Sequence, residues 1–173
     1  MEQLKQRIRH VPDFPKPGIL FYDITTLLRD PQGFKAAIDA MAAPVANERI
    51  DLVAGVESRG FIFAASLAER FAAGFVPIRK PGKLPAKSVS VEYTLEYGSG
   101  VLQMHEDAVV PGQRVLIVDD LLATGGTARA ACDLVTRCGG EVVAAGFLVE
   151  LAFLDGRSRL ADQRVYSVLS YAE

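Results

Sequence analysis

The sequence has few cysteines, no tryptophan, no excess of either charge and no long apolar run. Lys plus Arg number 19 and Asp plus Glu number 21, for a formal net charge of -2 over 173 residues. Proteins that bind nucleic acid through its phosphate backbone usually have a clear basic excess, so nucleic acid is not expected as a partner. The longest apolar run, Val142–Val149, is far shorter than the roughly 20 residues of a membrane-spanning helix, so a membrane is not expected either.

The sequence is also poor in the side chains that build metal sites or disulfide frameworks. Cys132 and Cys138 do not form a Cys-x-x-Cys pair, and we interpret both as inert packing residues. With His10 and His105 as the only histidines, no spacing typical of a protein-built zinc site is present. Any metal is therefore expected to arrive largely on the ligand. The charged N-terminus lacks the apolar stretch of a secretory signal, which predicts a cytoplasmic protein.

Aliphatic runs alternate with helical patterns along the chain. Half of the residues are hydrophobic, and a chain of this size removes roughly 70% of its unfolded surface from water, enough for one domain with a recessed site. Aliphatic strands joined by helices are typical of a parallel sheet covered on both faces, so the fold class is predicted to be α/β. The predicted helices span about 30–43, 60–71 and 127–138, and the predicted strands span 51–56, 75–78, 115–118 and 142–149.

Two stretches depart from this alternation. His10–Asp23 contains three prolines and cannot form a regular helix. Lys87–Met104 alternates apolar and polar residues on either side of a Gly-Ser-Gly stretch, which predicts a β-hairpin.

The most informative segment is 115–127, a predicted strand followed by a short loop and a helix start. Asp119 and Asp120 lie at the carboxyl end of the strand, where ligands bind in open parallel sheets. Beyond them, threonine hydroxyls and backbone N–H groups at a helix N-terminus form an arrangement that holds phosphate. The residues of this phosphate loop are Ala123, Thr124, Gly125, Gly126 and Thr127.

The phosphate loop predicts a particular kind of phosphate ligand. It lacks the lysine that reaches the terminal phosphates of a nucleoside triphosphate, so a monophosphate fits better. The neighbouring carboxylates would repel a bare phosphate, whereas a ribose 5-phosphate could donate its sugar hydroxyls to Asp119 and Asp120. The alternative is that the acids cap a helix and the glycines form a turn. We favour the ligand site because the acids, the loop and the helix start occur together.

The segment Val118–Thr127 resembles the phosphoribosyl pyrophosphate motif of type I phosphoribosyltransferases. Glu57–Phe61, Arg79–Pro85 and Tyr93–Gly98 narrow the resemblance to the members of that family that act on adenine. The similarity extends over the chain from Pro12 to Leu151.

The resemblance implies Mg²⁺-dependent transfer of a 5-phosphoribosyl group from 5-phospho-α-D-ribose 1-diphosphate to adenine, giving AMP and diphosphate in purine salvage. It implies a single type I phosphoribosyltransferase domain over 1–173, with a hood at about 10–24 and a flexible flap at about 83–104. It also implies a homodimer. Alternatives are transfer to another purine base, hydrolysis of a sugar phosphate, and a regulator that senses the phosphoribosyl donor.

The family's catalytic residues correspond here to Glu96, Asp119, Asp120 and Arg59. The glutamate would exchange a proton with the purine, although an exposed strand glutamate is the simpler interpretation. Arg59 would lie near the diphosphate and the base, although a surface pair with Glu57 is the alternative.

The remaining substrate-binding residues follow from the same resemblance. The basic run after residue 78 would cradle the diphosphate, although a solvated basic loop is the usual meaning of such a run. This chain has Tyr22 where some family members carry arginine, so the resemblance predicts the apolar cover of the hood but not its polar contacts. The proposed contacts are Ser58, Arg59, Arg79, Lys80 and Lys83 for the diphosphate, Tyr97 on the flap, and Leu20, Phe21 and Leu151 around adenine.

Overall fold

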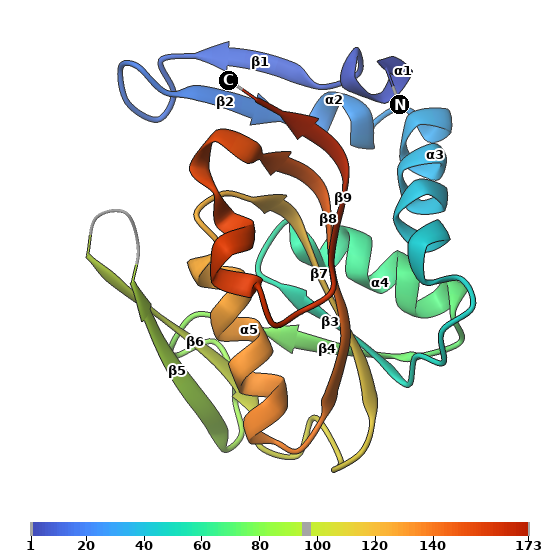
Figure 1. Ribbon diagram of the computed structural model, residues 1–173, viewed down its shortest axis with the longest axis vertical. Coiled ribbons are helices and arrows are strands. Elements are labelled where there is room, and N and C mark those ends of the chain that lie inside the picture. Colours follow the sequence, from blue (N-terminus) through green and yellow to red (C-terminus); the bar gives the residue numbers. More distant parts are fainter. Residues whose placement is uncertain (1, 95–97, 173) are drawn as a thin grey trace.

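A five-stranded parallel sheet forms the centre of the molecule (Figure 1). The computed structural model describes residues 2–94 and 98–172. Within them the strand order is β4-β3-β7-β8-β9, and every neighbouring pair is parallel. The predicted α/β class is thus confirmed. The strands are β3 (Leu52–Val56), β4 (Gly74–Ile78), β7 (Arg114–Leu122), β8 (Glu141–Leu151) and β9 (Val165–Tyr171).

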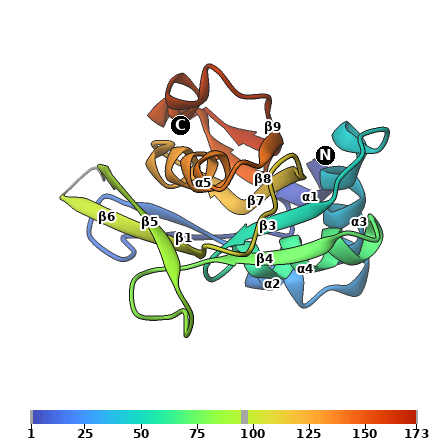
Figure 2. The same cartoon turned by 90° about the horizontal axis from the view of Figure 1, so that it is seen from below.

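Three longer helices cover the two faces of this sheet, close to their predicted positions. The side chain of Asp30 accepts a hydrogen bond from the backbone N–H of Gln32, and Pro31 occupies the first turn of α3, as the sequence predicts. Helices α3 and α4 lie on one face and α5 on the other (Figure 2). The helices are α1 (Glu2–Lys5), α2 (Thr25–Leu28), α3 (Pro31–Ala42), α4 (Gly60–Arg70) and α5 (Gly126–Arg137), with 3₁₀ turns at Ala43–Val45, Ala152–Leu154 and Gly156–Leu160.

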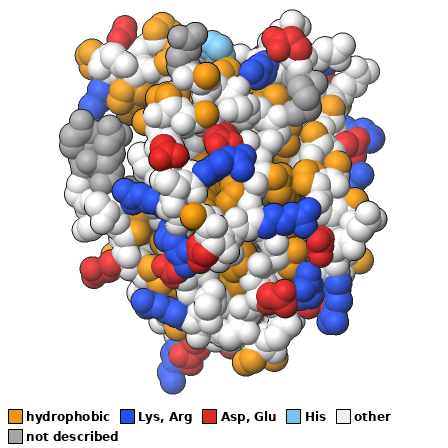
Figure 3. Space-filling view, viewed as in Figure 1, with side chains coloured by type: hydrophobic (Ala, Val, Ile, Leu, Met, Phe, Trp, Pro, Cys, Tyr) orange, Lys and Arg blue, Asp and Glu red, His pale blue; other side chains and the backbone are white. Residues whose placement is uncertain are grey.

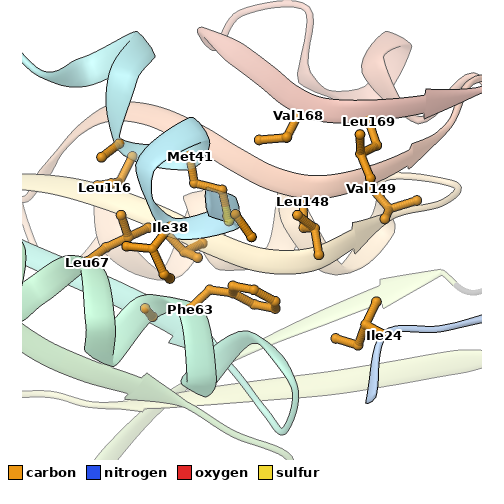
Figure 4. Packing of buried hydrophobic residues seen from close by; sticks show 14 of the residues in the cluster. Ile24, Ile38, Met41, Phe63, Leu67, Leu116, Leu148, Val149, Val168 and Leu169 are labelled. Carbon is orange, nitrogen blue, oxygen red and sulfur yellow. The ribbon is translucent and has the colours of Figure 1, made fainter. Parts of the chain in front are cut away.

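Apolar side chains are buried on both faces of the sheet. Because successive strand residues point to opposite faces, Leu116 and Val118 of β7 pack with α3 and α4, whereas Ile117 packs on the α5 side. Figure 4 shows the first of these clusters, with Phe63 of α4 and Met41 of α3 close to the strands. Burial of each large side chain contributes roughly 1.5–3 kcal/mol to folding.

Two antiparallel hairpins extend from this core. The first hairpin consists of β1 (Arg9–Pro12) and β2 (Leu20–Asp23) and corresponds to the segment expected to form the hood. It lies across the ends of β8 and β9 (Figure 1). The ring of Tyr22 anchors it, packing 4.2 Å from the ring of Tyr171. The predicted second hairpin is also present, as β5 (Ser88–Thr94) paired with β6 (Ser99–His105) beside α5.

Two strands of the central sheet differ from the sequence-based prediction. β9 was not predicted, since it is an edge strand that includes two serines in a seven-residue segment. β7 continues past Val118 to Leu122, so Asp119 and Asp120 lie inside the strand, and Asp119 is paired in register with Phe147 of β8. Both acids are therefore held by the ladder of the sheet and not by a loop.

No helix of the described residues is long and apolar enough to cross a membrane. On the face drawn in Figure 3, basic and acidic side chains are interspersed and form no continuous basic surface.

Candidate active site

A cavity of about 300 Å³ lies at the carboxyl ends of β3 and β7. It is lined by residues 56–59 at the end of β3 and in the loop that follows, by Lys80 after β4, and by residues 119–125 of β7 and the phosphate loop. Tyr93 and Leu102 of the β5–β6 hairpin complete one wall. The cavity therefore brings together four segments that are far apart in the sequence.

The two aspartates of β7 form the acidic wall of this cavity. The side chain of Asp120 is 7% exposed, and its Oδ2 lies 3.0 Å from Nε of Arg59. The backbone N–H of Asp120 donates to Oδ1 of Asp119 at 2.8 Å. Burial raises the pKa of Asp119, and the neighbouring carboxylate raises it further. Burial also raises the pKa of Asp120, although Arg59 opposes the rise.

The two carboxylates have fewer positive or hydrogen-bonding partners than they can accept, as expected of a ligand-binding site. Two carboxylates share one guanidinium, so within residues 2–94 and 98–172 they have no second positive partner and no hydroxyl donor bonded to them. A polyhydroxylated ligand or a developing positive charge would supply what is missing. The alternative pairing of Arg59 with Glu57 is not observed.

The phosphate loop turns tightly before α5. Gly125 is the residue before the helix and has φ +81°, a conformation that glycine adopts without steric cost. A Cβ on Gly125 would also come within 2.3 Å of the carbonyl oxygen of Gly156. Thr124, Gly125 and Thr127 line the cavity at the start of α5, where free N–H groups and the helix dipole favour an anion by roughly 0.3–1 kcal/mol.

Glu57 organises the opposite wall, a role that the sequence analysis missed. Its carboxylate accepts hydrogen bonds from the backbone N–H of Lys80 and from the guanidinium of Arg79, with Nη2 at 3.0 Å. Burial alone would raise the pKa of Glu57, but these two donors outweigh burial and lower it. The Glu57–Ser58 peptide bond is cis. Glu57 thus ties the loop after β3 to the loop after β4.

The basic residues predicted to bind diphosphate do not all lie in the cavity. Lys80 lines the cavity together with Ser58 and Arg59. Arg79 instead pairs with Glu57, and its guanidinium carbon lies 5.8 Å from the centre of the Phe61 ring. The exposed Lys83 is outside the cavity lining, and its backbone carbonyl accepts a hydrogen bond from Arg79 at 3.4 Å.

The predicted base-binding residues lie around the hood. The ring of Phe21 is 5.2 Å from the guanidinium carbon of Arg59, so the hood reaches the edge of the cavity. Leu20 is 42% exposed on the same strand, whereas Leu151 is buried at the end of β8. Glu96 and Tyr97 lie outside the described residues.

The parallel sheet, the buried carboxylates and the phosphate loop form an α/β domain suited to a phosphorylated sugar. The family model described as "phosphoribosyl transferase domain" matches residues 23–170. A protein of Acidobacterium capsulatum named adenine phosphoribosyltransferase is 60% identical over 172 residues, covering 99% of this chain and 95% of the relative. One of Solibacter usitatus with the same name is 59% identical over 99% of both chains.

Solved structures agree with these relatives. The crystal structure of adenine phosphoribosyltransferase from Thermoanaerobacter pseudethanolicus has a TM-score of 0.96 and 52% identity, covering 98% of this chain and 99% of that one. The enzyme from Saccharomyces cerevisiae, complexed with an imino-altritol bisphosphate and adenine, has a TM-score of 0.92 and 40% identity, covering 97% of each chain. The chain belongs to the phosphoribosyltransferase family, in its adenine phosphoribosyltransferase group.

Proposed function

We propose that this cavity is the site where the 5-phosphoribosyl group of 5-phospho-α-D-ribose 1-diphosphate is transferred to N9 of adenine. The observation that carries the proposal is the buried pair Asp119 and Asp120 beside the phosphate loop, with Arg59 shared between the carboxylates and the cavity. The products are AMP and diphosphate, as in purine salvage.

The ribose 5-phosphate end of the donor has a matching set of groups. The 5-phosphate accepts from the N–H groups and hydroxyls of the phosphate loop, residues 123–127, at the start of α5. The ribose hydroxyls donate to Asp119 and Asp120. As the bond from the ribosyl carbon to diphosphate lengthens, that carbon becomes positive, and the buried carboxylates stabilise the charge.

The diphosphate leaves toward the basic wall of the cavity. Ser58, Arg59 and Lys80 line this wall, and Lys83, exposed on the loop after β4, is proposed to contact the diphosphate as well. The electron pair of the broken carbon–oxygen bond goes to diphosphate. A lone pair of N9 forms the new bond to carbon, and the proton that N9 carries in neutral adenine is lost to a base, for which Glu96 is proposed. Arg79 is not proposed to bind the diphosphate directly, because its guanidinium is paired with Glu57.

The base is proposed to lie under the hood, between Leu20 and Phe21 on one side and Leu151 on the other. Glu96 of the flap is proposed to exchange a proton with the purine ring, with Tyr97 beside it closing the site. Acid–base help of this kind contributes about 10²–10⁴ in rate. Glu96→Ala is therefore expected to lower single-turnover rates and to leave donor binding nearly intact, and equal rates in variant and parent would contradict the assignment.

Members of this family use a metal ion, and we propose Mg²⁺. Within residues 2–94 and 98–172, no group of three or more His, Cys, Asp or Glu side chains is positioned to hold a metal. The hard oxygens of diphosphate and ribose would hold the ion, and Asp119 and Asp120 would bind the same ribose. Bound there, Mg²⁺ would neutralise the leaving group.

Two exposed apolar side chains support the proposed homodimer. Phe75 of edge strand β4 is 39% exposed and Ile62 of α4 is 38% exposed. The Phe75 ring packs edge-on against that of Phe61, which also contacts Arg79. Phe75→Glu is expected to shift the chain toward monomers in sedimentation experiments. The free thiols Cys132 and Cys138 fit the proposed cytoplasmic location.

The decisive experiment is a product assay. Purified protein with Mg²⁺ and the phosphoribosyl donor is given adenine, guanine or hypoxanthine in turn, and nucleotides are separated by chromatography. We expect AMP from adenine and little product from the other bases. Ribose 5-phosphate released at a comparable rate without any base would indicate a hydrolase, and absence of AMP would overturn the proposal.

A further inference from the structure

The segment that follows β8 lies directly against the phosphate loop. A Cβ on Gly156 would come within 2.2 Å of the carbonyl oxygen of Ala123 and 3.1 Å of the backbone nitrogen of Gly125. The reverse contact is equally close, since a Cβ on Gly125 would meet the Gly156 carbonyl oxygen at 2.3 Å. The two backbones therefore touch with no side chain between them, and a shift of Gly156 must move the loop.

The next residue, Arg157, is fixed by four acceptors. Its Nε and Nη2 donate to the two carboxylate oxygens of Glu150, each at 2.7 Å. Nη1 donates to the carbonyl of Val165 at 2.9 Å, and Nη2 also reaches Oγ of Ser167 at 3.1 Å. A bidentate guanidinium–carboxylate pair restricts both position and orientation. Because β8 and β9 carry these acceptors, the Gly156–Arg157 backbone is held to the sheet itself.

Glu150 is an unusual partner for a surface guanidinium because it is only 6% exposed. Removing the guanidinium would leave a buried carboxylate without its main partner, which is costly. The pKa of Glu150 is lowered, first by the hydrogen bonds from Arg157. The pair is therefore ionised at neutral pH and forms a rigid link.

A second arginine between β8 and β9, Arg164, provides a control residue for Arg157. Arg164 is 50% exposed in its side chain, close to the 46% of Arg157. It donates to Glu48 at 2.7 Å and to the carbonyl of Pro44 at 2.6 Å. It lies just before β9, at the end of the sheet opposite to the cavity. Arg164 thus resembles Arg157 in residue type and exposure, but its carboxylate partner Glu48 is 33% exposed, and it has no link to the phosphate loop.

We propose that Arg157, held by Glu150, is a positioning residue for the 5-phosphate site, because it fixes Gly156 as the backbone support of the phosphate loop. Arg157 does not touch the ligand. It keeps the N–H groups of residues 123–126 aimed at one point, so its loss weakens recognition of the phosphate more than recognition of the base. The inference rests on the proposed function in so far as that function names a 5-phosphate ligand.

AMP and adenosine make the test specific, since they differ only in the 5-phosphate. The ratio of the adenosine dissociation constant to the AMP dissociation constant, measured by calorimetry, reports the phosphate site alone. Arg157→Ala is expected to lower this ratio by about tenfold, as small displacements of binding groups do. Arg164→Ala is expected to leave it within about twofold, as for a distant independent site. Arg157→Lys, which keeps the charge without the planar fork, should restore part of the ratio.

The outcomes separate positioning from general loosening. If Arg157→Ala weakens AMP and adenosine equally, or if it matches Arg164→Ala, the proposal is wrong. Should Arg157→Ala fail to fold, Glu150→Gln and Arg157→Lys decide by the same ratio. The binding test stays informative if the wild-type chain makes no AMP from the phosphoribosyl donor, because that failure would refute only the proposed function.

Discussion

The charged side chains where the central strands begin and the two aspartates near the end of β7 are held in opposite ways. Where the strands begin, Arg114 pairs with exposed Glu141 at 2.6 Å, and its backbone N–H donates to Asp51 and lowers the pKa of that carboxyl. Where the strands end, Asp119 and Asp120 are buried beside a single guanidinium, and burial raises the pKa of both.

The difference separates stability from function within one sheet. At the strand starts, the carboxylates of Asp51 and Glu141 are hydrogen-bonded to donors of the protein itself. These residues therefore stabilise the fold and have few free acceptor positions for a ligand. At the strand ends Glu57 and Glu150 are paired as well, but Asp119 and Asp120 are kept buried without enough donors. Buried carboxylates of this kind, unfavourable for folding, are common in functional sites because a substrate or transition state supplies the missing partners.

Replacing one carboxylate at each end should give the largest contrast. Asp119→Asn removes a charge that stabilises the positive ribosyl carbon, so kcat/KM should fall by about 10²–10³, the typical effect of removing one preorganised electrostatic partner. The variant should be as stable as the parent, or more stable, because a buried charge is gone. Asp51→Asn should destabilise the protein and leave kcat/KM unchanged. Steady-state kinetics and denaturant unfolding of both variants measure the two effects. Loss of stability in Asp119→Asn together with normal activity would show that Asp119 stabilises the fold and does not act on the substrate.

Glycines with the same backbone conformation at the two ends allow a second test. Gly125 at the phosphate loop has φ +81° and Gly112 before β7 has φ +85°, but a Cβ on Gly112 would meet nothing within 4 Å. Alanine at either position costs about 1–2 kcal/mol in the left-handed region. Only Gly125→Ala also collides with Gly156, so it should raise KM for the phosphoribosyl donor by about tenfold or more, equivalent to roughly 1.4 kcal/mol.

Gly112→Ala serves as the control for the backbone cost. It should lose only about 1–2 kcal/mol, the cost of the left-handed conformation and less than the loss in Gly125→Ala, with an unchanged KM. If both variants change KM alike, the phosphate loop has no special dependence on its contact with Gly156.

The two ends should also respond oppositely to pH. The folded-state pKa of Asp119 is raised, so the folded protein binds this proton more tightly than the unfolded chain does. Its contribution to stability is therefore favourable at low pH and is lost as pH rises through the folded pKa. The folded-state pKa of Asp51 is lowered, so its contribution is present above the unfolded pKa and is lost as pH falls.

Unfolding free energies of the two variants, measured from below pH 3.8, the ordinary Asp value, up to pH 7, test this. Relative to the parent, Asp119→Asn should gain stability as pH rises, whereas Asp51→Asn should become less destabilising as pH falls. Parallel curves for the two variants would show that the carboxylates share one environment.

The parts of the site that were predictable from sequence are those contained in one continuous segment. The Asp pair, the phosphate loop and the start of α5 follow one another between 115 and 127, so local patterns identify them. The Asp30 cap and Pro31 likewise specify the start of α3.

The contacts that sequence reasoning missed join residues distant along the chain. Glu57 pairs with Arg79, 22 residues away, and not with the nearer Arg59. A run of basic residues shows that charge is present but not which way each side chain turns, and here Arg79 turns to Glu57 while Lys80 lines the cavity. The contact of Gly156 with Gly125 depends on the path of the chain after β8, for which no local pattern exists.

The two cysteines should give the smallest effect of all. Burial raises the pKa of Cys132 to about 12 and also raises that of Cys138. The thiolate is the reactive form, so both thiols should be slow to alkylate at pH 8. Cys138 is the more exposed and follows α5 at the end of the sheet where β8 begins, so it should react first and leave activity unchanged. Mass spectrometry of iodoacetamide-treated protein, with AMP formation assayed alongside, tests this. Rapid loss of activity on modification of Cys138 would mean that the strand-start end of the sheet is coupled to the cavity after all.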